Sequence, residues 1–330
     1  MTQLVGNGLT SAMRARAHRA RDVVSLMSLL GVARPWRVRL LRPTVERAVT
    51  LTADGLRLSA GYCPVDETVR PGIVLAHGAS RQGRRQALML VLATLLRARG
   101  YHVFSYDARC YGESDHPATA NDAAGFDFSR DVSAAVDWLS GRPEVDETRV
   151  YVLGHSFGAG AAVAAAANDR RIAKLVLFGP PRRLRERFLN ERAADRRQIL
   201  ARMQRDMNVP YELNEDVVCE MVNKRDIEAH AEQFASGGHP PTLLIDASRE
   251  SEADRAFLQA VAARMGDRAE YWTASGTDHY LNTGRVGAWV VYHPACVLPF
   301  VEKVDGFLGG AGSGGPTVGH RGLRGGGGDG

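Results

Sequence analysis

Short apolar runs alternate along this chain with longer segments that have helical spacing. The first two runs, Val45–Thr52 and Leu56–Cys63, are separated by the turn Ala-Asp-Gly and predict an antiparallel hairpin. The later runs are short and largely apolar, which is typical of parallel strands that are buried on both faces. They are Gly72–His77, Tyr101–Asp107, Arg149–Gly154, Ile172–Phe178, Thr242–Asp246 and Ala269–Thr273.

Helical patterns lie between these predicted strands. They cover Arg84–Arg99, Asp127–Ser140, Phe157–Asn168 and Ser251–Met265. Strands that alternate with helices are typical of a mostly parallel sheet with helices on both faces. The sequence therefore predicts an α/β fold.

One interval breaks this alternation. Residues from Pro180 to Pro241 form a much longer connection than is usual in α/β proteins, and they contain two or three helical patterns. We interpret residues 180–240 as a helical cap that is inserted over the sheet. Arginines mixed with acidic residues fill its first half. This pattern is compatible with an exposed helix face held by ion pairs, or with an entrance that attracts an anionic substrate or surface.

The N-terminal residues 1–43 are basic and contain a short apolar stretch, Val23–Ala33. This stretch is shorter than the roughly 18 residues that a membrane-spanning helix needs. Its embedded polar residues weaken the comparison with a signal peptide. An amphipathic helix that packs on the domain, or one that makes peripheral contact with a membrane surface, accounts for the same residues. A cytoplasmic location is the expectation, and export is the alternative.

The predicted domain covers residues 44–308, and its length and composition are those of a folded protein. A chain of 330 residues that is 45% hydrophobic can fill the core of one large α/β domain. Its four cysteines lie far apart and form no C-x-x-C pair, so neither a metal site nor a disulfide framework is indicated. The formal charge of +5 comes without a recognised nucleic-acid module. We expect no cofactor, no metal and no nucleic-acid partner; the oligomeric state is left open. Residues 309–330 are glycine-rich and predict a flexible tail.

The stretch V-Y-V-L-G-H-S-F-G-A-G, Val150–Gly160, places one serine between glycines. The spacing G-x-S-x-G is typical of a nucleophile elbow, where serine sits at a strained turn between a strand and a helix. A contact between small residues of a helix and a strand is the alternative for this spacing taken alone. The predicted strand before Ser156 and the predicted helix after it favour the elbow.

Serine becomes a nucleophile when a base takes its proton and an acid orients that base. His279 follows the last predicted strand and is the best placed histidine. The acid is less clearly determined. Glu250 fits best, because it lies in the loop just past a predicted strand, and Asp246 at the end of that strand is second. Three further carboxylates are less well placed: Glu252, Asp254 and Asp278.

Acyl transfer also needs two backbone N–H donors for the oxyanion of its intermediate. Phe157, the residue after the serine, is expected to supply the first. Ala79, in the loop after the strand Gly72–His77, is expected to supply the second. His77 precedes the serine and ends a strand, so we expect it to brace this loop.

Four motifs together make residues from about Val45 to Leu308 resemble the α/β-hydrolase superfamily. They are H-G-A-S at 77–80, D-A-R-C-Y-G-E-S-D at 107–115, G-H-S-F-G around Ser156, and the histidine at 279. The resemblance implies the α/β-hydrolase fold: an eight-stranded sheet, a cap after the sixth strand, and a Ser-acid-His site of the esterase, lipase or serine aminopeptidase type. Three features depart from the family pattern. Cys110 stands where glycine is usual, Glu250 stands where aspartate is usual, and Asp246-Ala247 stands where H-G is usual before that acid.

These observations predict a serine hydrolase that acts on a small-molecule acyl substrate. It would cleave a carboxylic ester or thioester through an acyl-enzyme on Ser156, with His279 as general base. A serine peptidase or aminopeptidase and an acyltransferase would use the same groups. A non-catalytic ligand-binding homologue is the alternative from another class.

Overall fold

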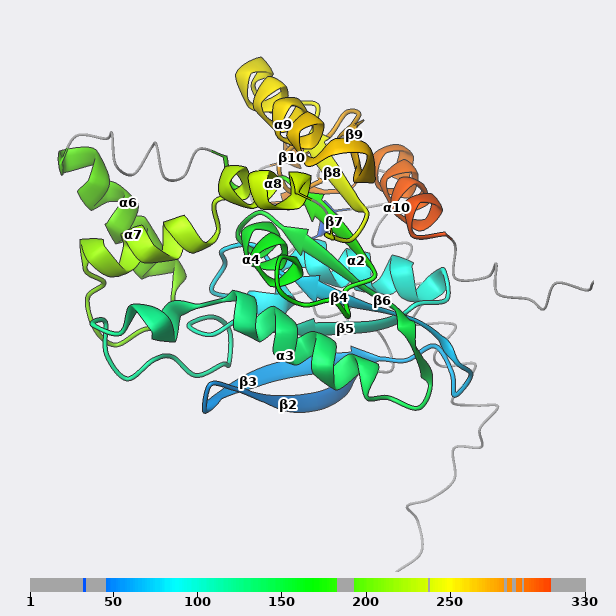
Figure 1. The fold of residues 1–330 in the computed structure, drawn as a ribbon, viewed down its shortest axis with the longest axis horizontal. Helices are drawn as coiled ribbons and strands as arrows, with labels where there is room; N and C mark the ends of the chain where they lie inside the picture. Colours follow the sequence, from blue (N-terminus) through cyan, green and yellow to red (C-terminus); the bar gives the residue numbers. More distant parts are fainter. Residues whose placement is uncertain are drawn as a thin grey trace, which may run out of the picture.

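The computed structural model describes residues 32–33, 46–182, 193–236, 238–281, 284–286, 289–292 and 294–309. An eight-stranded sheet forms its centre, with the strand order β2-β3-β5-β4-β6-β7-β8-β9 (Figure 1). Most of the predicted N-terminal helical segment, and the predicted tail beyond Gly309, lie outside the described residues. Val32 and Ala33 form a short strand, β1, in place of the expected helix.

The hairpin and the parallel strands of the sequence prediction are present. The bounds are β2 (Arg47–Ala53), β3 (Leu56–Cys63), β4 (Arg70–Ala76), β5 (His102–Tyr106), β6 (Val145–His155), β7 (Lys174–Phe178), β8 (Thr242–Ala247) and β9 (Ala269–Ala274). Within this sheet β3 pairs antiparallel with β2 and with β5, and the other pairs of these eight strands are parallel. The predicted α/β fold with a mostly parallel sheet is therefore confirmed.

Helices cover both faces of the sheet. One face packs against α3 (Ser129–Ser140), α4 (Phe157–Ala166) and α9 (Glu252–Met265), and the other against α2 (Ala87–Ala98) and α10 (Pro294–Leu308). Successive side chains of a strand point to opposite faces. In β6, Val152 accordingly belongs to the first core and Leu153 to the second. The apolar run of β6 is thus explained by two cores, one on each side.

The long interval between β7 and β8 contains, in its described part, helices α6 (Ala193–Asp206), α7 (Glu215–Lys224) and α8 (Ile227–Ala235). The side chain of Asn214 caps α7 by accepting a hydrogen bond from the Val217 N–H. The side chain of Asp226 caps α8 by accepting one from the Glu228 N–H. Figure 1 shows α6 and α7 beyond one end of the sheet strands. The arginines between 183 and 192 lie outside the described residues.

Two features differ from the sequence prediction. Strand β6 begins at Val145, four residues before the predicted start, because Arg70 and Pro71 of β4 also pair with its first two residues, Val145 and Asp146. Helix α10 was not predicted; it contains Pro299 and packs Phe300 and Val304 into the core beside α2. A small sheet of β1, β10 (Gly284–Val286) and β11 (Trp289–Val291) was also not predicted.

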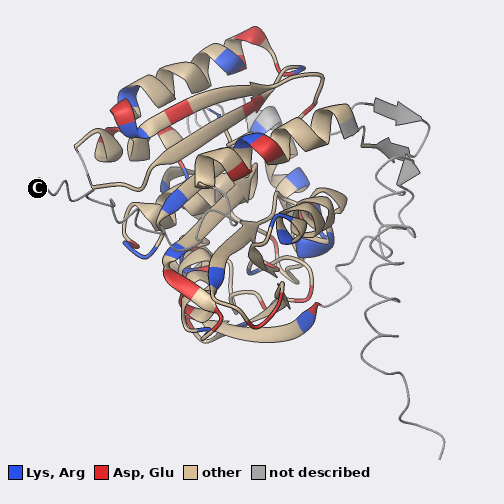
Figure 2. Ribbon diagram, turned by 90° about the vertical axis from the view of Figure 1, so that its right-hand side faces the viewer, with Lys and Arg blue, Asp and Glu red and all other residues tan. Residues whose placement is uncertain are grey.

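Charged residues of both signs are interspersed over the described surface (Figure 2). None of the helices described has the length and apolar character to cross a membrane. Nor do the described residues include a cluster of three or more His, Cys, Asp or Glu side chains suited to a metal ion.

Candidate active site

Ser156 occupies a strained turn between β6 and α4. Its backbone has a φ of 51° and a ψ of −118°, a conformation that costs free energy for any residue with a side chain. The Ser156 N–H donates a hydrogen bond of 2.9 Å to the carbonyl of Phe178 on β7, which ties the turn to the neighbouring strand. The strained turn predicted from the G-x-S-x-G spacing is present.

Close backbone contacts explain the glycines that follow Ser156. A Cβ atom at Gly158 would lie 2.2 Å from the carbonyl oxygen of Ala76 at the end of β4. A Cβ atom at Gly160 would lie 3.0 Å from the Cβ of Arg225. The first turn of α4 is therefore packed between the end of β4 and Arg225, the residue that follows α7.

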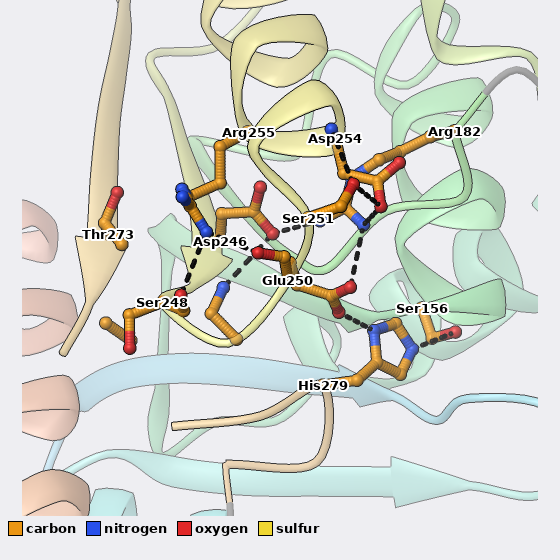
Figure 3. Close-up of polar contacts among 12 residues, drawn as sticks. Ser156, Arg182, Asp246, Ser248, Glu250, Ser251, Asp254, Arg255, Thr273 and His279 are labelled. Atoms are coloured by element: carbon orange, nitrogen blue, oxygen red, sulfur yellow. Dashed lines mark hydrogen bonds and ion pairs between the residues drawn. The ribbon is translucent and has the colours of Figure 1, made fainter. Parts of the chain in front are cut away.

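The structure brings Ser156, His279 and Glu250 together in one line of hydrogen bonds (Figure 3). The distance from His279 Nε2 to Ser156 Oγ is 2.9 Å, and the distance from His279 Nδ1 to Glu250 Oε1 is also 2.9 Å. An ionised carboxylate only accepts hydrogen bonds, so Nδ1 carries the proton. The lone pair of Nε2 is then directed at the serine hydroxyl, as a general base requires.

Glu250 is held in the turn that follows β8. Its N–H donates to the carbonyl of Ala247, at 3.1 Å, and the N–H of Arg249 donates to the carbonyl of Thr277, at 3.0 Å. The second of these bonds joins the Glu250 turn to the loop that carries His279. The hydrogen bond from His279, together with the nearby guanidinium of Arg182, lowers the pKa of the Glu250 carboxyl. Glu250 is therefore ionised at neutral pH.

Asp246, the second candidate for the acid, makes a different contact. It is fully buried at the end of β8 and forms an ion pair with Arg182. The second terminal nitrogen of Arg182 lies near Glu250, with 3.4 Å between Nη1 and Oε2. Burial raises the pKa of the Asp246 carboxyl. Asp246 thus anchors Arg182 beside Glu250, and Glu250 alone of the two contacts the imidazole.

The other three carboxylates also have separate roles. Asp254 exchanges hydrogen bonds with Ser251 at the start of α9, and Glu252 is the first residue of that helix. Both fit the acidic first turn of a helix. Asp278 accepts a hydrogen bond of 2.9 Å from the Tyr280 N–H and so shapes the loop next to His279.

A cavity of about 440 Å³ opens at the Ser156 hydroxyl. Ala79, in the loop after β4, and Phe157 both line it. Phe157 is the first residue of α4, and the first N–H groups of a helix have no partner within the helix. Apolar side chains of α6 and α7 also line the cavity, namely Ile199, Met203 and Val222. A substrate beside Ser156 would therefore contact the helices between β7 and β8.

The loop after β4 is braced by His77, as its place in the sequence indicates. The His77 Nε2 accepts a hydrogen bond of 3.0 Å from the Ala108 N–H. Its Nδ1 therefore carries the proton and donates to the carbonyl of Gly78, at 2.7 Å. His77 is buried, and both of its ring nitrogens are occupied by these backbone hydrogen bonds.

Charged residues of the motif at 107–115 bind to other segments of the chain near the site. Arg109 is fully buried and its guanidinium pairs with Asp131 of α3, with 2.6 Å between Nη2 and Oδ1. Asp107 accepts a hydrogen bond of 2.7 Å from the Arg84 N–H. Cys110, at the position where the family usually has glycine, has a φ of 67°. The chain keeps the left-handed turn that glycine favours, with a buried thiol in its place.

Sequence reasoning did not identify three residues of this site: His155, Arg182 and Arg225. His155 is buried beside Ser156 within the G-H-S-F-G motif, so its position was available from the sequence. Arg182 belongs to the arginine-rich interval, where many arginines looked equivalent. Arg225 follows α7, and no pattern in the sequence connects it to the cavity that it lines.

Comparison with protein families matches residues 67–254, more than half of the chain, to the family described as serine aminopeptidase, S33. The quorum-quenching protein AidA of Acinetobacter baumannii is 34% identical over 136 residues, which are 41% of this chain and 43% of that protein. The polyketide transferase af380 of Aspergillus fumigatus is 32% identical over 130 residues, 39% of this chain and 43% of that protein. The matched region therefore spans less than half the length of either relative.

Solved structures with the same fold include the esterase Pf2001 of Pyrococcus furiosus. It has a TM-score of 0.55 and 20% sequence identity to this chain, and the superposition covers 84% of this chain and 94% of the esterase. At this level of identity the likeness shows the fold alone.

Proposed function

Because this chain belongs to the serine aminopeptidase (S33) family of α/β-hydrolases, we propose that it is a serine hydrolase that cleaves a carboxylic ester or thioester. The observation that carries the proposal is the line of two 2.9 Å hydrogen bonds from Glu250 through His279 to Ser156. A serine at a strained turn, next to an imidazole whose orientation a carboxylate fixes, is the arrangement that acyl transfer needs.

The reaction would proceed in two steps. Ser156 Oγ attacks the carbonyl carbon of the substrate while His279 Nε2 takes the hydroxyl proton. The negative oxygen of the tetrahedral intermediate accepts hydrogen bonds from the N–H groups of Phe157 and Ala79. His279 then returns the proton to the leaving oxygen or sulfur. Water, activated by the same nitrogen, releases the acid from Ser156.

Glu250 has two tasks in this scheme. It keeps the proton of neutral His279 on Nδ1, so that Nε2 faces the serine, and it stabilises the imidazolium that forms during each step. Its lowered pKa supports both tasks, because the carboxyl stays ionised at neutral pH. Arg182 holds the second oxygen of Glu250 and limits rotation of the carboxylate.

The helices α6, α7 and α8 would act as the cap of this site. Side chains of α6 and α7 line the cavity opposite Ser156, and its volume of about 440 Å³ is within the range of small-molecule sites. A small acyl compound fits this description. The cap would then determine which acyl compounds reach the serine.

Transfer of the acyl group to an acceptor other than water is a second candidate. The observation in its favour is that three of the relatives are named polyketide transferases. Both activities share the acyl-enzyme and differ only in the molecule that captures the acyl group. The ratio of free acid to transferred product, in the presence of an alcohol or amine acceptor, separates them.

Trapping of the acyl-enzyme tests the proposal. After rapid acid quenching of a reaction with p-nitrophenyl acetate, mass spectrometry should find one acetyl group on the peptide that contains Ser156. The Ser156→Ala protein should form no such adduct. A folded wild-type protein that releases p-nitrophenol no faster than its Ser156→Ala variant would contradict the proposal.

A further inference from the structure

Arg225 is a buried cation at the edge of the cavity. Only 4% of its surface is exposed, and it lies directly after α7. Its Nε donates a hydrogen bond of 2.8 Å to the carbonyl of Met221. The guanidinium lies over the ring of Phe157, with 4.0 Å between its central carbon and the ring centre, and 5.5 Å from the ring of Phe128. This arginine is therefore fixed next to the residue that follows Ser156.

The other charged side chains at the cavity are paired. Arg182 binds Asp246 and Glu250, and Arg182 Nη1 lies 3.8 Å from Asp254 Oδ2. The distance from Arg202 Nε to Asp206 Oδ2 is 3.9 Å. Arg225, in contrast, has no carboxylate within ion-pair distance among the residues that the structure describes. The described part of the cavity thus holds one positive charge without a negative partner.

Such a charge is costly to bury. Removal of a cation from water is unfavourable unless hydrogen bonds and an opposite charge replace the water. Burial lowers the pKa of Arg225 to about 10, so the group is still charged at neutral pH. The aromatic rings and the carbonyl end of α7 compensate part of this cost. The rings contact the flat face of the Arg225 guanidinium, and the carbonyl of Met221 accepts from Nε. The Nη1 and Nη2 donors have no hydrogen-bond partner among the described residues.

We propose that Arg225 binds a carboxylate of the substrate, so that the substrate is an ester or thioester that carries a free carboxylate. This inference rests on the proposed hydrolase function. Two parallel N–H groups of a guanidinium match the two oxygens of a carboxylate, and stacking on Phe157 holds the guanidinium in one plane. The apolar side chains of Ile199 and Met203 on the cap side suit the chain that joins the carboxylate to the ester group.

A matched pair of substrates tests the proposal. Mono-p-nitrophenyl adipate carries a free carboxylate, and its methyl ester is the neutral equivalent of nearly the same length. Wild-type protein should have the higher kcat/KM for the free acid. In Arg225→Met, which keeps an unbranched apolar side chain without the guanidinium, the ratio of the two kcat/KM values should fall at least about tenfold. Arg205→Met, which removes an exposed arginine of α6 away from the cavity, should keep the wild-type ratio.

Equal kcat/KM values for the two esters in the wild type, or an unchanged ratio in a folded Arg225→Met protein, would overturn the proposal. A second measurement does not depend on catalysis. Adipate should raise the midpoint of thermal unfolding of the Ser156→Ala protein, and dimethyl adipate should not. Equal effects of the two compounds would also overturn the proposal. If the wild-type protein forms no acyl-enzyme, stabilisation by adipate that is lost in Arg225→Met would support Arg225 as the binding residue while rejecting the hydrolase function.

Discussion

The ring of His155 donates a hydrogen bond of 2.8 Å, through Nε2, to the backbone carbonyl of His279. A carbonyl only accepts, so Nε2 carries the proton of His155. The ring centres of His155 and His279 lie 5.1 Å apart. Ser156 and the residue before it therefore contact two different parts of His279: the hydroxyl meets the ring, and the His155 imidazole meets the backbone. This second contact positions the loop that carries the base.

The His155 contact predicts a change in kcat without an equal change in KM. In His155→Leu the carbonyl of His279 loses its donor, and we expect kcat for p-nitrophenyl acetate to fall by about tenfold. His155→Gln can still donate from its amide and should recover most of the activity. Similar kcat values for wild type and His155→Leu would show that the loop keeps its position without this bond.

Burial of His155 also predicts how stability depends on pH. Burial lowers the pKa of His155 to about 3, well below the value of about 6.5 in an unfolded chain. Between these values the unfolded state binds the extra proton, so stability is lost as the pH falls. His155 should contribute about 2 kcal/mol to the loss in unfolding free energy between pH 7 and pH 5. Urea denaturation of wild type and His155→Gln at both pH values measures it, and equal losses in the two proteins would contradict the prediction.

The contacts of Glu250 and Asp246 predict opposite results for two similar substitutions. Glu250→Gln should lower kcat at least about tenfold, because the imidazolium loses the charge that stabilises it. Asp246→Asn should change kcat less than about threefold, because Asp246 acts on Arg182 and does not contact the ring. Steady-state kinetics of both variants check this. A larger effect of Asp246→Asn than of Glu250→Gln would assign the acid to Asp246.

The packing of α4 predicts a difference between two glycines. Gly158→Ala would place Cβ 2.2 Å from the Ala76 carbonyl oxygen, a backbone atom of a central strand. We expect this variant to lose about 3 kcal/mol or more of unfolding free energy. Gly160→Ala meets Arg225 at 3.0 Å and should cost less, because α7 can move slightly. Thermal unfolding compares the two, and equal stabilities would show that the first turn of α4 is not held against β4.

The sheet and the local settings of Ser156 and Glu250 could be predicted from the sequence, because they depend on the pattern of neighbouring residues. The β6 run and the alanine-rich α4 have strong periodicity or composition, so the turn at Ser156 follows from its flanks. The sequence favours Glu250 over Asp246 as the candidate acid, because a residue inside a strand points into a core, whereas a residue in the next turn is free to reach a loop. That reasoning agrees with the contacts of both side chains.

Features that depend on packing between distant segments could not be predicted in this way. Helix α10 contains prolines at 294 and 299, and a proline inside a helical pattern predicts that the helix ends there. Packing of the apolar side of α10 against the sheet stabilises the helix nonetheless. Arg225 contacts Phe157 only because α7 packs on the first turn of α4. The partner of Arg182 likewise depends on how the chain after β7 meets the end of β8.

The most direct test of the account is covalent labelling by a fluorophosphonate, which reacts with a serine that an adjacent base activates. We predict stoichiometric labelling of the wild-type protein on the peptide that contains Ser156. Labelling should be absent in Ser156→Ala and reduced at least about a hundredfold in rate in His279→Ala. A folded wild-type protein that remains unlabelled, or one labelled at the same rate after removal of His279, would contradict the central claim that Glu250 and His279 activate Ser156.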